Sequence, residues 1–170
     1  MTEFSRPMPL SDFNRSPARM KIKAEPAEFP ALATRLGVPT VISLDAFVTV
    51  RRTDSRLRVV GTFEAAIEQV CVVSLEPFQN AAAGEIEEEF LLTDDPDSPE
   101  VDLDAAEIMV EPFSGEAIDL GEIVVQNLLL VLDPHPRAGG AELTDLDYDP
   151  AQLGTAGNPF AALGKLNLKR

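Results

Sequence analysis

The chain has 170 residues, a formal net charge of −15 and a single cysteine, and 45% of its residues are hydrophobic. This length and composition predict one folded domain and exclude global disorder. A single cysteine excludes an internal disulfide and a zinc or redox motif made from a pair of thiols. No stretch approaches the roughly 20 apolar residues of a membrane span, and the first residues lack the apolar core of a secretory signal. We therefore expect a cytoplasmic protein with no membrane partner.

The charge is distributed unevenly along the chain. Residues 1–58 contain ten Lys and Arg against six Asp and Glu, whereas residues 59–136 contain nineteen Asp and Glu and no Lys or Arg. Residues 137–170 contain four of each sign. The central segment should repel phosphate and anionic lipid and favour basic partners through interactions that salt screens. Simple solubility is the alternative explanation of the same charge.

The first half of the chain predicts an arm, a strand, a helix and a hairpin. Residues 1–18 are rich in Pro, Ser and Arg without periodicity, which predicts a flexible N-terminal arm, either free or partly paired to a domain over residues 19–137. Apolar residues alternate with lysines over residues 20–24, which predicts a strand with one basic face. Helical spacing over residues 25–36 predicts a helix, regular from Pro30 and ended by Gly37. Alternation over residues 42–50 and 57–67, around a polar turn, predicts a β-hairpin.

The second half predicts another strand, an acidic loop, a helix and a tail. Pro77 and residues 80–84 should break the apolar run that follows the hairpin, and residues 86–92 predict a strand with an acidic outer face. Residues 93–104 contain two prolines among many acids and predict a mobile loop, before a short strand at residues 108–110. Asp119 and Glu122 are spaced as a helix cap for residues 120–132. Residues 138–170 predict an extended tail with a short helix at residues 159–166.

This order of elements favours an α+β fold. We expect an antiparallel β-sheet or a partly closed barrel, packed by two main helices, with an acidic loop and an extended C-terminal tail.

The motifs of the common enzyme classes are missing from the sequence. His135, the one histidine, lies between two prolines, and the chain has no nucleophile elbow, Walker loop or dinucleotide fingerprint. The aspartates of residues 94–104 lack the glycine that an EF-hand loop requires at its sixth position, which favours a solvated loop over a calcium site. We expect no enzymatic activity, no cofactor, no metal and no small-molecule substrate. A small enzyme would need two carboxylates facing each other in a cleft.

Cys71 follows an alternating strand, and its parity matches the buried series Phe63, Ala65 and Ile67. A reactive thiol would need a cationic neighbour to lower its pKa, whereas the nearby sequence contains Glu68 and Glu76. We therefore interpret Cys71 as a small core residue.

Three segments carry a resemblance to a known family. They are QVCVVSLEPF at residues 69–78, GEAIDLGEIVVQNLLLVLDPHPR at residues 115–137 and NPFAALGKL at residues 158–166. In this order and spacing they resemble the YceD-like family, the large ribosomal RNA subunit accumulation proteins. The resemblance implies a bacterial cytoplasmic factor of ribosome biogenesis that supports accumulation of large-subunit (23S) ribosomal RNA, with no established enzymatic activity.

The family pattern maps onto three places in this chain. Many relatives carry a Cys-x-x-Cys pair, of which Cys71 matches the first member, while Ser74 stands at the second place. We assign structural roles in capping, turning and packing to Cys71, Glu76, Pro77, Phe78 and Asp119. The tail motif Asn158, Pro159 and Phe160 either docks back on the domain or anchors a partner.

The resemblance leaves two kinds of partner, a basic ribosomal protein or the precursor of large-subunit ribosomal RNA. The acidic side chains Glu87, Glu88 and Glu89 are the candidates for a basic ribosomal protein. Direct RNA contact would need a basic path, with aromatics for stacking scarce. Its candidates are Lys21, Lys23, Arg51, Arg52 and Arg58, together with Arg15, Arg19 and Arg56. In that case the residues 59–136 should face away from RNA. The alternative function is a general adaptor or assembly chaperone unconnected with RNA.

Overall fold

The structure, a computed structural model, describes residues 3–13, 17–93 and 110–141. Five strands form the main sheet in the order β2-β3-β4-β5-β6, and a second, two-stranded sheet pairs β1 with β7. All pairs are antiparallel except β5 with β6. The strands are β1 (Pro7–Pro9), β2 (Ala18–Lys23), β3 (Thr40–Arg52), β4 (Arg56–Val70), β5 (Pro77–Leu92), β6 (Glu111–Phe113) and β7 (Ala117–Asp119). The helices are η1 (Leu10–Phe13, a 3-10 turn), α1 (Phe29–Leu36) and α2 (Leu120–Val131).

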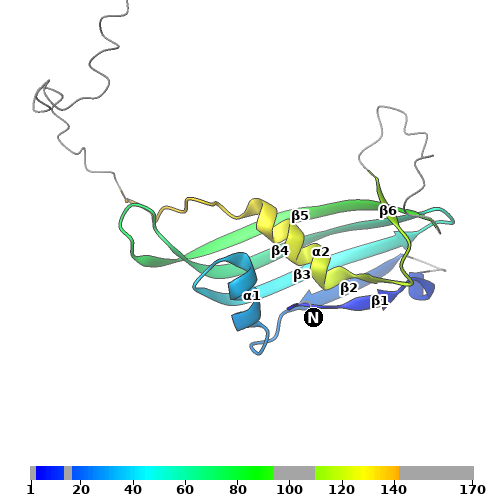
Figure 1. Ribbon diagram of the computed structural model, residues 1–170, viewed down its shortest axis with the longest axis horizontal. Helices are drawn as coiled ribbons and strands as arrows, with labels where there is room; N and C mark the ends of the chain where they lie inside the picture. The colour runs from blue at the N-terminus through cyan, green and yellow to red at the C-terminus, as the bar shows by residue number, and fades with distance from the viewer. Residues whose placement is uncertain (1–2, 14–16, 94–109, 142–170) are drawn as a thin grey trace, which may run out of the picture.

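The predicted α+β class is confirmed, but the sheet does not close into a barrel. Strands β2 and β6 end the order of strands without pairing to each other. The helices pack on one face of the sheet, with α2 lying along β4 and β5 (Figure 1). Alternate residues of β3 and β4 face these helices and are buried, as in Leu44, Val48, Val59 and Ile67. Because β-strand side chains alternate between faces, the intervening residues form a second face with no helix over it in the described part of the chain.

Both helix boundaries follow the signals found in the sequence. Pro30 lies in the first turn of α1, and Gly37 ends the helix with a φ of 67°, a conformation that glycine adopts without strain. The Asp119 side chain accepts hydrogen bonds from the backbone N–H groups of Gly121 and Glu122. It is therefore the predicted N-cap of α2.

Strand β5 begins earlier than the sequence predicts. Residues 80–84 were expected to break the strand, yet they pair with β4 in one uninterrupted register, from Pro77 opposite Val70 to Leu91 opposite Arg56. Gly84 lies opposite Phe63, and a Cβ atom at position 84 would lie 2.7 Å from Cζ of that ring. A small residue is therefore required for packing here, which a reading of glycine as a strand breaker misses.

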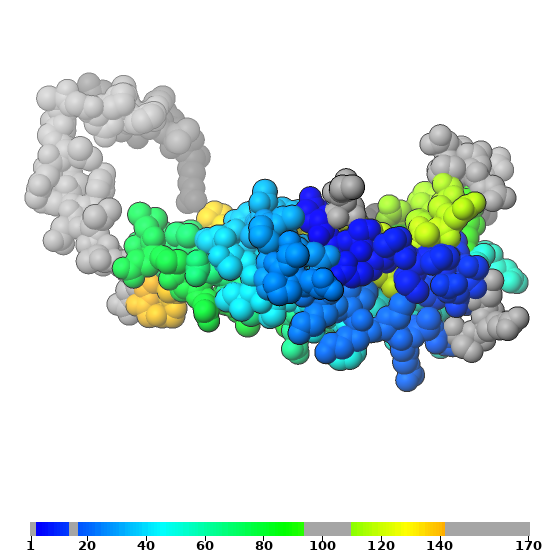
Figure 2. Space-filling view, turned by 90° about the horizontal axis from the view of Figure 1, so that it is seen from below, coloured from blue at the N-terminus to red at the C-terminus, as the bar shows by residue number. Residues whose placement is uncertain are grey.

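The described residues of the N-terminal segment are paired to the domain, which is one of the two arrangements expected for the arm. Phe4 and Phe13 are buried in the main core, and β1 pairs with β7 immediately before α2. In the space-filling view the N-terminal residues, in dark blue, run along the molecule beside β2 (Figure 2). Aromatic burial against the rest of the fold outweighs the local signal of proline and serine. The expected acidic loop, the strand at residues 108–110 and the C-terminal tail lie largely or wholly outside the described residues.

Candidate functional site

The uncovered face of the sheet, called here the open face, gathers most of the predicted contact residues. One row across it, from strand to strand, is Lys21, Phe47, Thr62 and Glu85. The row runs from a basic residue on β2 to an acidic residue on β5, and the next row does the same, from Arg19 to Glu87. The row that begins at Lys23 has its acids on β3 and β4 instead. We define the basic half of the open face as Arg19, Lys21, Lys23 and Arg51, and the acidic half as Glu64, Glu68, Glu85, Glu87 and Glu89.

Four of the eight RNA-contact candidates form the basic half, and Arg15 lies outside the described residues. Lys21 and Lys23 point from β2, and Asp45 on β3 lies 3.5 Å and 3.9 Å from their Nζ atoms. Arg51 is exposed and stands directly opposite Arg58 across β3 and β4. Like charges at opposed positions of two strands repel each other, and the ion pair of Arg58 with Glu87 offsets this repulsion.

The other three candidates, Arg52, Arg56 and Arg58, are used differently, and Arg56 pairs with Glu89. The Arg58 Nη2 atom donates a 2.5 Å hydrogen bond to Oε1 of Glu87, which neutralises its charge within the open face. Arg52 points to the covered face, where its Nη1 atom donates to the backbone carbonyl of Leu10 at 2.9 Å. The number of basic residues is known from the sequence, but the pairing of the strands decides which of them face solvent.

Phe47 is a feature of the basic half that the sequence analysis missed. Its side chain is 59% exposed in the middle of β3, and Lys21 Nζ lies 5.2 Å from the centroid of its ring. An exposed aromatic ring beside a cation can stack on an unpaired base or hold another planar cationic group. Its parity, opposite to that of the buried Ala46 and Val48, is the sequence signal that identifies its outward direction.

The three acidic candidates do not share one surface. Glu87 and Glu89 face the open side, where they pair with Arg58 and Arg56. Glu88 faces the helices and accepts a 3.0 Å hydrogen bond from Nδ2 of Asn127 on α2. Glu64, Glu68 and Glu85 instead complete the acidic half, because β4 and β5 bring their alternating positions together. Consecutive residues of a strand point to opposite faces, so the Glu87–Glu89 triplet divides.

Cys71 lies in a tight turn between β4 and β5. The backbone N–H groups of Val73 and Ser74 donate to its sulfur at 3.4 Å each. The turn closes through Cys71 N–H to the Glu76 carbonyl at 2.9 Å and includes Leu75 with a φ of 59°. The side chain of Cys71 is fully buried, although it lies outside the main cluster of core side chains.

The environment of Cys71 favours its thiolate without a cationic neighbour. The Ser74 hydroxyl contributes most, followed by the backbone amides of Ser74 and Ala138, and with that of Val73 they lower the pKa of Cys71 to about 6 despite burial, which raises it. The sequence has no cation near Cys71, yet the pKa of this thiol is lowered, because hydrogen bonds stabilise the thiolate instead. Ser74, which stands at the second cysteine place of the family pattern, acts here as a hydrogen-bond partner of Cys71.

The remaining family-pattern residues have structural positions. Pro77 begins β5 opposite Val70, and the half-buried Phe78 stands opposite Gln69. The Glu76 side chain is exposed, and its backbone carbonyl closes the Cys71 turn.

Asp119 joins α2 to the N-terminal segment. Burial acts to raise its pKa, but hydrogen bonds from the Ser5 hydroxyl and from the backbone amides of Arg6, Glu122 and Gly121 outweigh burial, so the pKa is lowered. Asp119 therefore does more than cap the helix, because it also ties residues 5 and 6 to the start of α2. The sequence signal predicted only the cap.

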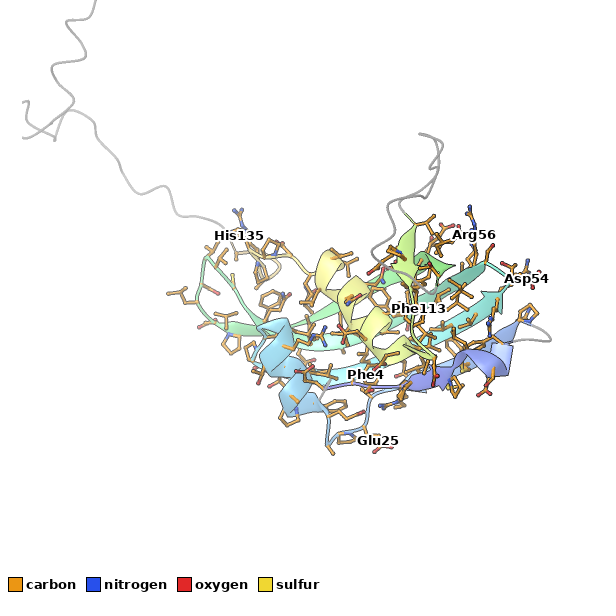
Figure 3. All side chains as sticks on the ribbon, turned by 45° about the vertical axis from the view of Figure 1, so that its right-hand side comes forward. Phe4, Glu25, Asp54, Arg56, Phe113 and His135 are labelled. Carbon is orange, nitrogen blue, oxygen red and sulfur yellow. The ribbon has the colours of Figure 1, made fainter. Side chains whose placement is uncertain are left out.

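A shallow groove of about 400 Å³ lies at the end of the molecule near Cys71. Its lining is mainly aliphatic and comes from the ends of α1, β4 and α2, with Leu36, Val70, Val72 and Leu129 among the contributors. His135 lies at this end, whereas Asp54 and Arg56 lie at the β3–β4 hairpin at the opposite end (Figure 3). A second, polar hollow near that hairpin includes Asp54 and Glu116, both of which are exposed.

The tail candidates Asn158, Pro159 and Phe160 lie outside the described residues. Within the described ranges, no group of three or more His, Cys, Asp and Glu side chains is placed to hold a metal ion. Neither described α-helix has the length and apolar character needed to cross a membrane.

Comparison with known proteins identifies the family. The family model of the large ribosomal RNA subunit accumulation protein YceD matches residues 59–167. Since this match covers more than half of the chain, the chain belongs to the YceD family. Neither a curated protein nor a solved structure gives a significant match.

Proposed function

We propose that this member of the YceD family is a non-enzymatic binding factor of ribosome biogenesis, which supports accumulation of large-subunit ribosomal RNA through contacts made by the open face of its sheet. The family name points to large-subunit ribosomal RNA, and this part of the proposal follows from membership. The observation that carries the rest is the charge gradient across the open face, with only basic charges on β2 at one edge, only acidic charges on β5 at the other, and both signs on β3 and β4 between them. We place the protein in the cytoplasm, where the subunit precursors are.

The acidic half is the proposed contact for a basic ribosomal protein. Glu64 and Glu85 are exposed and make no ion pair with another described residue, so their charge is available to a partner. Opposite potentials across an interface accelerate association and discriminate against acidic competitors. A factor of this kind would hold a basic ribosomal protein until its RNA site is formed.

Direct contact with RNA is a second candidate function, favoured by Phe47. The exposed ring lies between the lysines of β2 and Thr62, on the half of the open face that repels phosphate least. Stacking of one base on an aromatic side chain contributes about 1–3 kcal/mol. From the sequence we expect all of residues 59–136 to face away from RNA. In this second function RNA covers β2 and β3, so only the acidic half has to face away from it.

The non-enzymatic part of the proposal rests on the family name. Two hollows bear on its alternative, an enzyme with two carboxylates facing each other in a cleft. The apolar groove contains a single carboxylate, Asp133, among its lining residues. The polar hollow contains Asp54 and Glu116, but both are exposed rather than held against each other in a closed site. A general adaptor unconnected with RNA has no support from the family.

In-cell crosslinking followed by identification of RNA and protein partners tests this proposal. The full chain should be compared with Glu64→Lys plus Glu85→Lys, and with Lys21→Glu plus Lys23→Glu, while 23S ribosomal RNA is quantified. We expect the first pair to lose crosslinks to basic ribosomal proteins and the second to lose crosslinks to RNA. If neither the parent chain nor the variants crosslink to large-subunit precursors at low salt, the proposed function is contradicted.

A further inference from the structure

The outer edge of β5 is a long row of backbone groups without a partner strand. Strand β6 pairs with β5 only at Phe90, Leu91 and Leu92. From Pro77 to Glu89 no other strand of the described chain adds to this edge. The register with β4 is continuous over this length, so the strand keeps a regular geometry. Proteins usually cover such an edge or interrupt it, because it is a template for another strand.

We propose that this edge of β5 binds an extended, basic segment of a partner protein by strand addition. This inference rests on the proposed function and specifies how its acidic half would engage a basic ribosomal protein. Strand addition obtains affinity from main-chain hydrogen bonds and specificity from side chains at alternate positions. Both features are present along β5.

The open side of β5 selects a basic segment. Glu85, Glu87 and Glu89 occur at every second residue. Glu87 and Glu89 already pair with arginines of β4 on their inner side, whereas Glu85 is exposed without an ion pair to a described residue. An added strand would place its own alternate side chains directly opposite these carboxylates, about 5 Å away. Lysine or arginine at every second position therefore fits this edge.

The helix side of β5 selects apolar residues at the intervening positions. Val131 on α2 is 46% exposed and lies beside Gly84, where its Cγ1 atom would be 3.3 Å from an added Cβ. Leu130, in the same turn, is 82% exposed. The intervening side chains of an added strand would cover part of this apolar surface. The predicted occupant thus alternates basic and apolar residues.

The charge of the chain disfavours two other occupants of the edge, and the C-terminal tail is left as an outcome of the test below. A second copy would bring another net charge of −15 to the same surface. Residues 94–109, which follow β5 in sequence, contain seven acidic residues and no Lys or Arg. Neither offers the basic side chains that the glutamates require.

The test uses the full chain and a synthetic peptide of about ten residues that alternates lysine and valine. Hydrogen exchange measured by NMR should show that every second amide from residue 83 to residue 87 becomes protected when the peptide binds. The amide of Ala81 is left out because it already donates to Oδ1 of Asn80. The same peptide N-methylated at every residue lacks the donors for strand pairing in either orientation and should neither bind comparably nor protect these amides. Equal binding of both peptides, or binding without protection of β5, would overturn strand addition. So would protection already present in the free chain, which would mean that the tail or a second copy occupies the edge.

Two matched charge reversals distinguish the edge from general attraction. Glu85→Lys on β5 and Glu64→Lys one strand inside change the net charge equally. Affinity for the peptide should fall roughly fivefold or more in the first variant and distinctly less in the second, because only Glu85 would stand opposite the added strand. Equal losses would contradict the edge as the binding site.

The same variants separate this inference from the proposed function. If the peptide protects β5 but Glu85→Lys leaves 23S ribosomal RNA and ribosomal-protein crosslinks unchanged, the edge binds such segments but the acidic-contact function is wrong. If the crosslinks depend on Glu64 and Glu85 equally and no protection appears, the function stands and the edge proposal is wrong.

Discussion

The two faces of the main sheet use the same kinds of residues for different purposes. On the covered face, charges are joined in fixed contacts, as where Arg35 binds Glu3 and Glu122 and thereby connects α1, α2 and the N-terminal segment. The hydrogen bond to Glu122 is the largest of the effects that raise the pKa of Arg35. On the open face, Phe47 and several charged side chains face solvent. Substitutions should therefore affect stability on one face and partner binding on the other.

The largest expected effect is on the covered face, at the centre of α2. Leu128 is fully buried, and Leu128→Ala should lower the free energy of unfolding by about 2–5 kcal/mol, because it removes apolar contacts and leaves a cavity. Leu130→Ala is the matched control, since the same change occurs two residues away on an exposed side chain. Urea unfolding of both variants measures the difference. Equal losses in the two would show that α2 is not packed as described.

The next effect concerns the contact of the N-terminal segment with α2. A Cβ atom at Gly121 would lie 2.0 Å from the Phe4 carbonyl oxygen, so Gly121→Ala should cost about 1–3 kcal/mol as the segment is pushed away. Gly139→Ala, where nothing lies within 4 Å, is the control. Thermal unfolding of both variants checks the prediction. An unchanged melting temperature for Gly121→Ala would mean that residues 3–13 are not held against α2.

Asp119 should give a smaller effect that depends on pH. Asp119→Ala removes the cap of α2 and should cost about 1–2 kcal/mol at neutral pH. The folded-state pKa of Asp119 is lowered, so its stabilising contribution is complete above the unfolded-state pKa, roughly 4, and is lost as pH falls through the folded-state value. Asp119→Asn should therefore flatten the pH dependence of unfolding in acid. Parallel curves for the parent chain and Asp119→Asn would refute this assignment.

On the open face, Phe47→Ala should leave stability within about 0.5 kcal/mol, because the ring is mostly exposed. If RNA contacts the basic half, the same variant should reduce crosslinking to RNA while crosslinks to ribosomal proteins remain. Thr62→Ala, at the position directly opposite on β4, is a control for changes in the sheet itself. Loss of stability in Phe47→Ala comparable to that of Leu128→Ala would remove the distinction between the two faces.

The smallest effect is local to the Cys71 turn. Ser74→Ala should raise the pKa of Cys71 from about 6, because it removes the hydroxyl that stabilises the thiolate most. Titration of the thiolate by ultraviolet absorbance measures this shift, and Ser55→Ala in the β3–β4 hairpin is the control. If the pKa of Cys71 does not change, the backbone amides alone stabilise the thiolate.

Several elements could be predicted because their signals are local. The cap at Asp119, the glycine after α1 and the alternation of β3 and β4 each depend on residues close in sequence. The start of β5 could not be predicted, since residues 80–84 form a strand only because β4 offers a partner and Phe63 needs a small neighbour. The burial of Phe4 likewise depends on α2, more than 100 residues later.

For the candidate site, the sequence by itself determined the family resemblance, the separation of charge along the chain and the residue types available for binding. Tertiary structure alone decided which charges share a surface, because strand register places residues distant in sequence side by side and sends consecutive residues to opposite faces. Glu88 thus left the predicted acidic surface, Arg58 was neutralised by Glu87, and Phe47 and the β5 edge became the features open to a partner. Periodicity along one strand indicates that a face exists, whereas only the neighbouring strands decide what that face contains.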